Sequence, residues 1–204
     1  LSGGIAKDGV DLTFSGGGTI YVTAPITGAS ANSDLIVDGA TVNLDAANTY
    51  NGPTSIINMG TLNANVSGAL PTPTYSDVSV ETGSTLNLNN GFGQTVASLA
   101  GGGDIIANGG ALTLTIAGAA SQDFTGVLQN GTGTLSLVMN GGTQTLSGSN
   151  TYSGTTTVSA GTLQVVNNAI QRDRVWSVAS GAILEFNVPS SNYTAPGFMD
   201  LSGD

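Results

Sequence analysis

The densest group of reactive side chains surrounds Trp176, the single tryptophan of the chain. Arg172, Asp173 and Arg174 precede it, so a sugar ring could stack on the indole while the charged groups hydrogen-bond its hydroxyls. This pattern predicts a glycan-binding site. The plainer alternative, which we favour, is a loop whose tryptophan caps the neighbouring structure and whose charges are solvated.

A second group contains carboxylates. Asp34 and Asp38 stand four residues apart, and carboxylate oxygens together with loop carbonyls are the ligands that calcium prefers. Solvated corner residues are again the alternative that we favour. Asp77 and Glu81 repeat the spacing, but a carbohydrate-cleaving enzyme would need these four carboxylates and a base gathered in one groove.

Histidine and cysteine are both absent from the 204 residues. The commonest general base and zinc ligand is therefore missing, as are disulfides and thiolate chemistry. Serines are frequent, but no histidine is present to activate one as a nucleophile. We expect no catalytic residues, no enzymatic activity and no cofactor.

The charge balance excludes several partners. Three basic residues face thirteen acidic ones, which gives a formal net charge of −10. Nucleic acids and anionic membrane surfaces attract proteins through clusters of Lys and Arg, so neither is an expected partner. No run of about 18 apolar residues exists, and we expect no membrane insertion of this segment.

A long internal repeat organises the chain. SGSNTYSGTTTVSAGTLQV, from Ser147, resembles AANTYNGPTSIINMGTLNA, from Ala46, and Asn48 and Asn150 are 102 residues apart (150 − 48 = 102). We expect two units, about 1–98 and 99–200, within a single segment 1–204 that is an excerpt of a longer repetitive chain. Tyr50 and Tyr152 are expected to be structural, and each Asn to bond the backbone of its turn.

A shorter period lies inside the long one. A glycine followed by an alternating polar and apolar stretch recurs at steps of 21, 21, 23, 27, 23, 28 and 20 residues. Alternation of this kind predicts short β-strands, and a fixed short period predicts stacked units. The eight stretches are 18–22, 39–44, 60–64, 83–88, 110–114, 133–137, 161–165 and 181–186.

Each such strand is too short to be stable alone. In Thr85 to Leu88 (TLNL), two leucines point to one side, and each contributes about 1.5–3 kcal/mol when buried. That gain does not offset roughly 1–2 kcal/mol of backbone entropy per ordered residue, whereas stacking makes the apolar side continuous. We predict an all-β solenoid of about nine coils, each of roughly 20–28 residues.

The phrase from Leu146 to Val165 (LSGSNTYSGTTTVSAGTLQV) resembles the autotransporter-associated β-strand repeat of type V secretion passenger domains. Residues 44–62 are similar but more divergent, and include Pro53. The resemblance implies a right-handed parallel β-helix that is exported to the bacterial cell surface or released. In that family the repeat supports passenger secretion and folding and has no catalytic residues.

These observations predict a non-enzymatic structural segment of an extracellular bacterial protein, acting as a rigid stalk, an adhesin or a fibre unit. Its partners would be a host-cell or matrix surface, a glycan, or further copies of itself joined head to tail through unpaired strand edges. The alternative function is a carbohydrate-binding or carbohydrate-cleaving β-helix.

Overall fold

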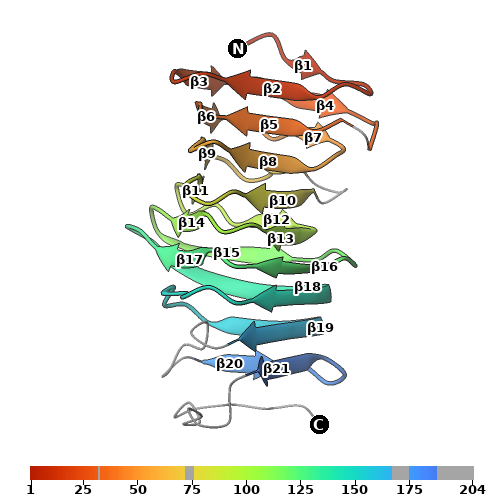
Figure 1. Cartoon of the computed structure of the whole chain (residues 1–204), viewed down its shortest axis with the longest axis vertical. Helices are drawn as coiled ribbons and strands as arrows, with labels where there is room; N and C mark the ends of the chain where they lie inside the picture. Colours follow the sequence, from red (N-terminus) through yellow and green to blue (C-terminus); the bar gives the residue numbers. More distant parts are fainter. Residues whose placement is uncertain (32, 72–75, 167–174, 188–204) are drawn as a thin grey trace.

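The computed structural model describes residues 1–31, 33–71, 76–166 and 175–187. Within them the chain forms a β-solenoid of about eight turns with no helix, which confirms the predicted fold class. The coils are stacked in chain order, with β1 (Ile5–Ala6) at one end and β21 (Ile183–Asn187) at the other (Figure 1). No segment of the described chain forms a helix that could cross a membrane.

Each complete coil crosses three faces, and strands on the same face pair in parallel with those of the coils before and after. The second face begins with β2 to β13, continues through β16 and the later parts of β18 and β19, and ends at β21. The strands of this face that precede β21 are β2 (Leu12–Ser15), β5 (Leu35–Asp38), β8 (Thr54–Ile57), β10 (Asp77–Val80), β13 (Ser98–Ala100), β16 (Ser121–Phe124), β18 (Thr134–Leu146) and β19 (Thr156–Val166).

The third face is a six-stranded parallel sheet, and the first face is built from a three-stranded sheet and the early parts of β18 and β19 with their neighbours. The third face contains β3 (Thr19–Val22), β6 (Thr41–Leu44), β9 (Thr61–Ala64), β11 (Thr85–Leu88), β14 (Asp104–Ala107) and β17 (Val127–Asn130). The first face contains β1, β4 (Ile26–Gly28), β7 (Thr49–Tyr50), β12 (Gln94–Val96), β15 (Ala111–Ile116) and β20 (Trp176–Val178).

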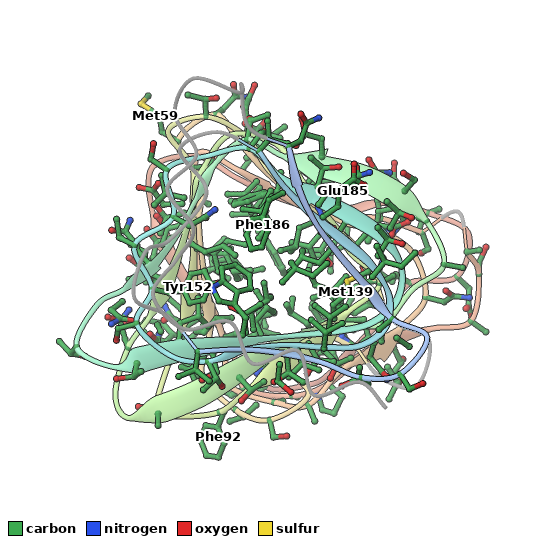
Figure 2. All side chains as sticks on the ribbon, turned by 90° about the horizontal axis from the view of Figure 1, so that it is seen from below. Met59, Phe92, Met139, Tyr152, Glu185 and Phe186 are labelled. Atoms are coloured by element: carbon green, nitrogen blue, oxygen red, sulfur yellow. The ribbon has the colours of Figure 1, made fainter. Side chains whose placement is uncertain are left out.

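All eight stretches predicted from the glycine period contain strands, and their inward positions stack into one core. On the third face Ile20, Val42, Leu62, Leu86, Ile105 and Leu128 lie in register from coil to coil. Seen along the solenoid axis, the outline is roughly triangular, and Met139, Tyr152 and Phe186 point inward (Figure 2). Burial of these continuous rows is what one coil alone could not provide.

Small residues line the corner between the second and third faces. In the third-face strands after β3, the first backbone N–H donates to the carbonyl of a small residue in the coil before, as in Thr41 to Gly18, Asp104 to Ser84 and Val127 to Gly103. A Cβ at Gly103 or Gly126 would collide with backbone carbonyl groups. At Gly103 and Gly126 the corner therefore holds consecutive coils too close together for a side chain.

The two sequence-related phrases lie on different faces. Thr54 pairs with Leu35 and Val78 on the second face, whereas its counterpart Thr156 pairs with Leu137 and Trp176 on the first. The glycine steps of 27 and 28 residues explain this shift, because each adds a strand beyond a full turn. The division into units 1–98 and 99–200 stays a prediction.

Candidate functional site

The structure does not bring Asp34 and Asp38 together. Asp34 precedes β5 and Asp38 ends it, so at ~3.3 Å per residue their Cα atoms are about 13 Å apart. Each lies in a separate hydrogen-bond network: the backbone N–H of Asp34 donates to Asp11 Oδ1 at 2.9 Å, and Asp38 Oδ1 accepts from Asn58 Nδ2 at 2.7 Å. The residues described contain no cluster of three acidic side chains that could hold a metal ion.

Asp77 and Glu81 repeat this separation along β10. Asp77 Oδ1 accepts a hydrogen bond from Ser98 Oγ at 2.6 Å. Glu81 Oε2 accepts one from the backbone N–H of Asn58 at 2.7 Å, so Asn58 links Glu81 to Asp38. Asp34 and Asp77 thus lie where the strands of the second face begin, and Asp38 and Glu81 lie where these strands end. The four carboxylates do not converge in one groove.

Trp176 is a core residue and not a surface platform. Its side chain is 1% exposed, and its ring packs edge-on against Phe186 with 5.3 Å between centroids. A sugar could stack on it only if the core opened, so the structure corrects the assignment of Trp176 to a glycan site. Arg172, Asp173 and Arg174, the other members of that predicted site, lie outside the described residues.

The repeated Asn and Tyr residues are structural, but Asn48 bonds the backbone of the neighbouring coils and not that of its own turn. Asn48 Oδ1 accepts from the backbone N–H of Ile26, and Asn150 Oδ1 accepts from that of Leu128, both at 2.8 Å and across one turn. Tyr50 and Tyr152 are buried, and the hydroxyl of Tyr50 lies 2.7 Å from Thr54 Oγ1. The motif therefore fixes a corner twice, on two different faces.

A buried lysine was not found by sequence reasoning. Lys7 is 1% exposed, its Nζ donates to the carbonyl of Ser33, and it lies 4.7 Å from the ring centroid of Tyr50. Burial lowers the pKa of Lys7, although Asp34 and Asp11 oppose the shift. Burial also raises the pKa of Tyr50, against a smaller effect of its bond to Thr54.

The outward side of the third face carries regular rows of polar residues. Tyr21, Asn43, Asn63 and Asn87 occupy one row, in register from β3 to β11. The neighbouring row contains Thr19, Thr41, Thr61 and Thr85. Thr-apolar-Asn recurs at 41, 61 and 85 in the sequence, but only the register shows that these residues share a face.

The asparagines of this face form hydrogen-bonded ladders. Asn63 Nδ2 donates to Asn43 Oδ1 at 3.0 Å, and Asn87 Nδ2 donates to Asn63 Oδ1 at 2.8 Å. A parallel ladder joins Asn89 through Asn65 to Asp45, with both donor–acceptor distances at 2.7 Å. We call the outward residues 19, 21, 41, 43, 45, 61, 63, 65, 85, 87 and 89 the amide face.

Comparison with known proteins shows to which family the repeated segment belongs. The passenger-associated-transport-repeat family model matches residues 38–64 and 140–165. These ranges contain both copies of the Asn-Thr-Tyr corner. The chain is an autotransporter passenger segment.

One curated relative of this passenger segment is the adhesin BmaC autotransporter of Brucella suis biovar 1 (strain 1330). It is 39% identical over 168 residues, which cover 75% of the chain and 5% of that protein. The passenger segment therefore spans about one twentieth of the length of this relative. No solved structure matches it.

Proposed function

We propose that this passenger segment is a rigid, non-enzymatic rod of a surface-exposed or secreted autotransporter, holding adhesive surface away from the cell. The observation that carries the proposal is continuity. Inward residues of the second face stack from Phe14 through Val37 and Ile56 to Val80, and again from Phe124 through Leu146 to Phe186. Eight turns at ~4.8 Å give a rod about 40 Å long.

The likeness to a protein named as an adhesin supports the adhesive part of the proposal. The carboxylates of the second face are held apart and bonded to neighbouring coils, which supports a role without catalysis. Rigidity follows from the parallel ladder, since bending the rod would break backbone hydrogen bonds between coils.

The test is made in the parent protein on living bacteria. We expect that replacing residues 1–204 by a Gly/Ser linker of the same length reduces adhesion to cultured host cells. Such a flexible chain spans about 70–85 Å on average, but it fixes neither the distance nor the direction of the surface that it carries. Surface amounts are matched by antibody labelling of intact cells. Undiminished adhesion of the linker strain would refute the rigid-rod proposal.

Head-to-tail self-association remains a further proposal. It predicts that the purified chain increases in mass with concentration, measured by light scattering after size-exclusion chromatography. A constant monomer mass up to millimolar concentration would contradict it.

A further inference from the structure

The amide face has hydrogen-bonding capacity that its ladders do not use. An asparagine amide has two N–H donors and an oxygen with two lone pairs. In the ladder, Asn63 donates once to Asn43 and accepts once from Asn87, while Asn87 donates to Asn63 and accepts from Asn108 at 3.3 Å. Each of the two therefore keeps one donor and one lone pair, and both side chains are half-exposed.

The ladders also hold the amides in fixed positions. Binding a ligand through mobile side chains loses affinity because each must be ordered, at roughly 0.5–1.5 kcal/mol per side chain. Here the ordering is already done by bonds of 2.7–3.0 Å between coils. Neighbouring amides repeat at the coil spacing of ~4.8 Å, so the four rungs from β3 to β11 span about 14 Å.

The charge of the face selects the ligand. Asp45 lies within it and Asp104 follows Thr85 in the next coil, whereas Lys7, the single Lys or Arg in the described part of the chain, is buried. An acidic polymer would be repelled by these carboxylates and would find no exposed cation among the described residues. A neutral hydroxyl-rich ligand suits amides and threonines, which both donate and accept.

An aromatic side chain completes the surface. Tyr21 is 58% exposed and begins the row that Asn43, Asn63 and Asn87 continue. Its ring offers a flat apolar platform with a polar hydroxyl, which is the kind of contact that the apolar side of a sugar ring requires. Aromatic and amide groups thus follow one another along the solenoid axis.

We infer that the amide face binds a neutral, extended polysaccharide laid along the solenoid axis, with a sugar stacked on Tyr21 and hydroxyls bonded to Asn43, Asn63 and Asn87. This inference rests on the proposed surface-exposed function and names the partner of that surface. It moves the glycan site predicted around Trp176 to a different part of the molecule.

The binding test uses the purified chain and four probes. Cellohexaose, chitohexaose and mannohexaose are the neutral ligands, and polygalacturonate is the acidic comparator. We expect at least one neutral probe to bind saturably in isothermal titration calorimetry and to shift the NMR amide signals of residues 41–45, 61–65 and 85–89. Absence of saturable binding by all three neutral probes at millimolar concentration, or preference for polygalacturonate, overturns the inference.

A matched pair of variants locates the site. Asn63→Thr with Asn87→Thr removes two amides while keeping residues that suit a strand, and should weaken binding about tenfold or more. Gln164→Thr is the control, because Gln164 is an outward amide that links Thr145 and Glu185 on the second face. Circular dichroism checks folding, and Tyr21→Thr gives an independent loss of binding if the double variant unfolds. Equal affinity in wild type and Tyr21→Thr, or in wild type and a folded double variant, contradicts the assignment.

Introducing Asn63→Thr with Asn87→Thr into the parent protein distinguishes the rigid-rod proposal from the polysaccharide-binding proposal. Normal adhesion with lost glycan binding would show that the rod functions without the amide face. Lost adhesion of the linker strain together with absent glycan binding in the wild-type chain would support the rod and reject the polysaccharide.

Discussion

At the scale of single residues, the repeated asparagine holds one coil on the next. Asn48 is 2% exposed, accepts from the backbone N–H of Ile26 and donates to the carbonyl of Ala69 at 2.6 Å. One side chain therefore links three successive coils. Its removal leaves two buried backbone groups without partners, and such groups are expensive to leave unsatisfied.

We therefore expect Asn48→Ala to lower the free energy of unfolding by about 2–4 kcal/mol, measured by urea denaturation. Asn51→Ala is the control, because its side chain makes an exposed bond to Ala29 at 3.2 Å and its loss should change stability by about 0.5 kcal/mol or less. Similar destabilisation by both substitutions would show that the buried contacts of Asn48 contribute little.

Lys7 and Tyr50 make the stability of the folded chain depend on pH in the alkaline range. The usual pKa of lysine is 10.5, and burial lowers that of Lys7. Between the lowered pKa and 10.5, the unfolded chain keeps a proton that the folded chain has released, so stability rises with pH in this window. Above 10.0, the unfolded chain ionises Tyr50 while the folded chain keeps its proton, so this contribution falls as the pH rises.

The matching experiment compares urea denaturation of wild type and Lys7→Met between pH 7 and 10. The stability of the wild type should rise relative to the variant as the pH increases, because methionine fills the site without a charge to desolvate. Lys7 is the single lysine, so no other lysine contributes. A constant difference across this range would show that the lysine pKa is not lowered by folding.

At the scale of elements, glycines at the corner between the second and third faces allow consecutive coils to approach closely. A Cβ at Gly126 would collide with the carbonyl oxygen of Gly103, and one at Gly148 with that of Gly126. We expect Gly126→Ala to destabilise the solenoid by about 1–3 kcal/mol through overpacking, and to increase hydrogen exchange mainly in the adjoining coils, because each coil contacts only its neighbours.

Gly17→Ala supplies the comparison for this prediction. Nothing lies within 4 Å of a Cβ at Gly17, and its φ is not positive. The melting temperature and the hydrogen-exchange pattern of the Gly17→Ala variant should match those of the wild type. Equal effects of the two substitutions would mean that glycine at the corner serves chain flexibility and not close packing.

At the scale of the whole molecule, the faces are not equivalent along the rod. The amide face occupies β3 to β11, and after it the chain places its Gly-led strands on the first and then the second face. Equivalent residues of the two repeat phrases consequently do not build one continuous surface. A rod of this kind can present different polar surfaces in different directions while keeping a single core.

The amino-acid sequence was sufficient to predict the eight glycine-led strands and which of their side chains face inward. Thr85, Leu86, Asn87 and Leu88 illustrate why, because alternation is a local property and the two buried leucines follow from it. The 102-residue offset likewise predicted the structural role of Asn48 and Asn150. These features require no knowledge of which coil lies above which.

Which residues share a face became evident only from the packing of the coils. The number of residues taken by each corner depends on how one coil packs on the next, so steps of 27 and 28 residues hide an additional strand. For the same reason, the sequence left a sugar platform open for Trp176 beside the favoured capping role, and did not show the asparagine ladders. Side chains separated by 20 or more residues become neighbours through register, and register is fixed by the packing of the whole stack.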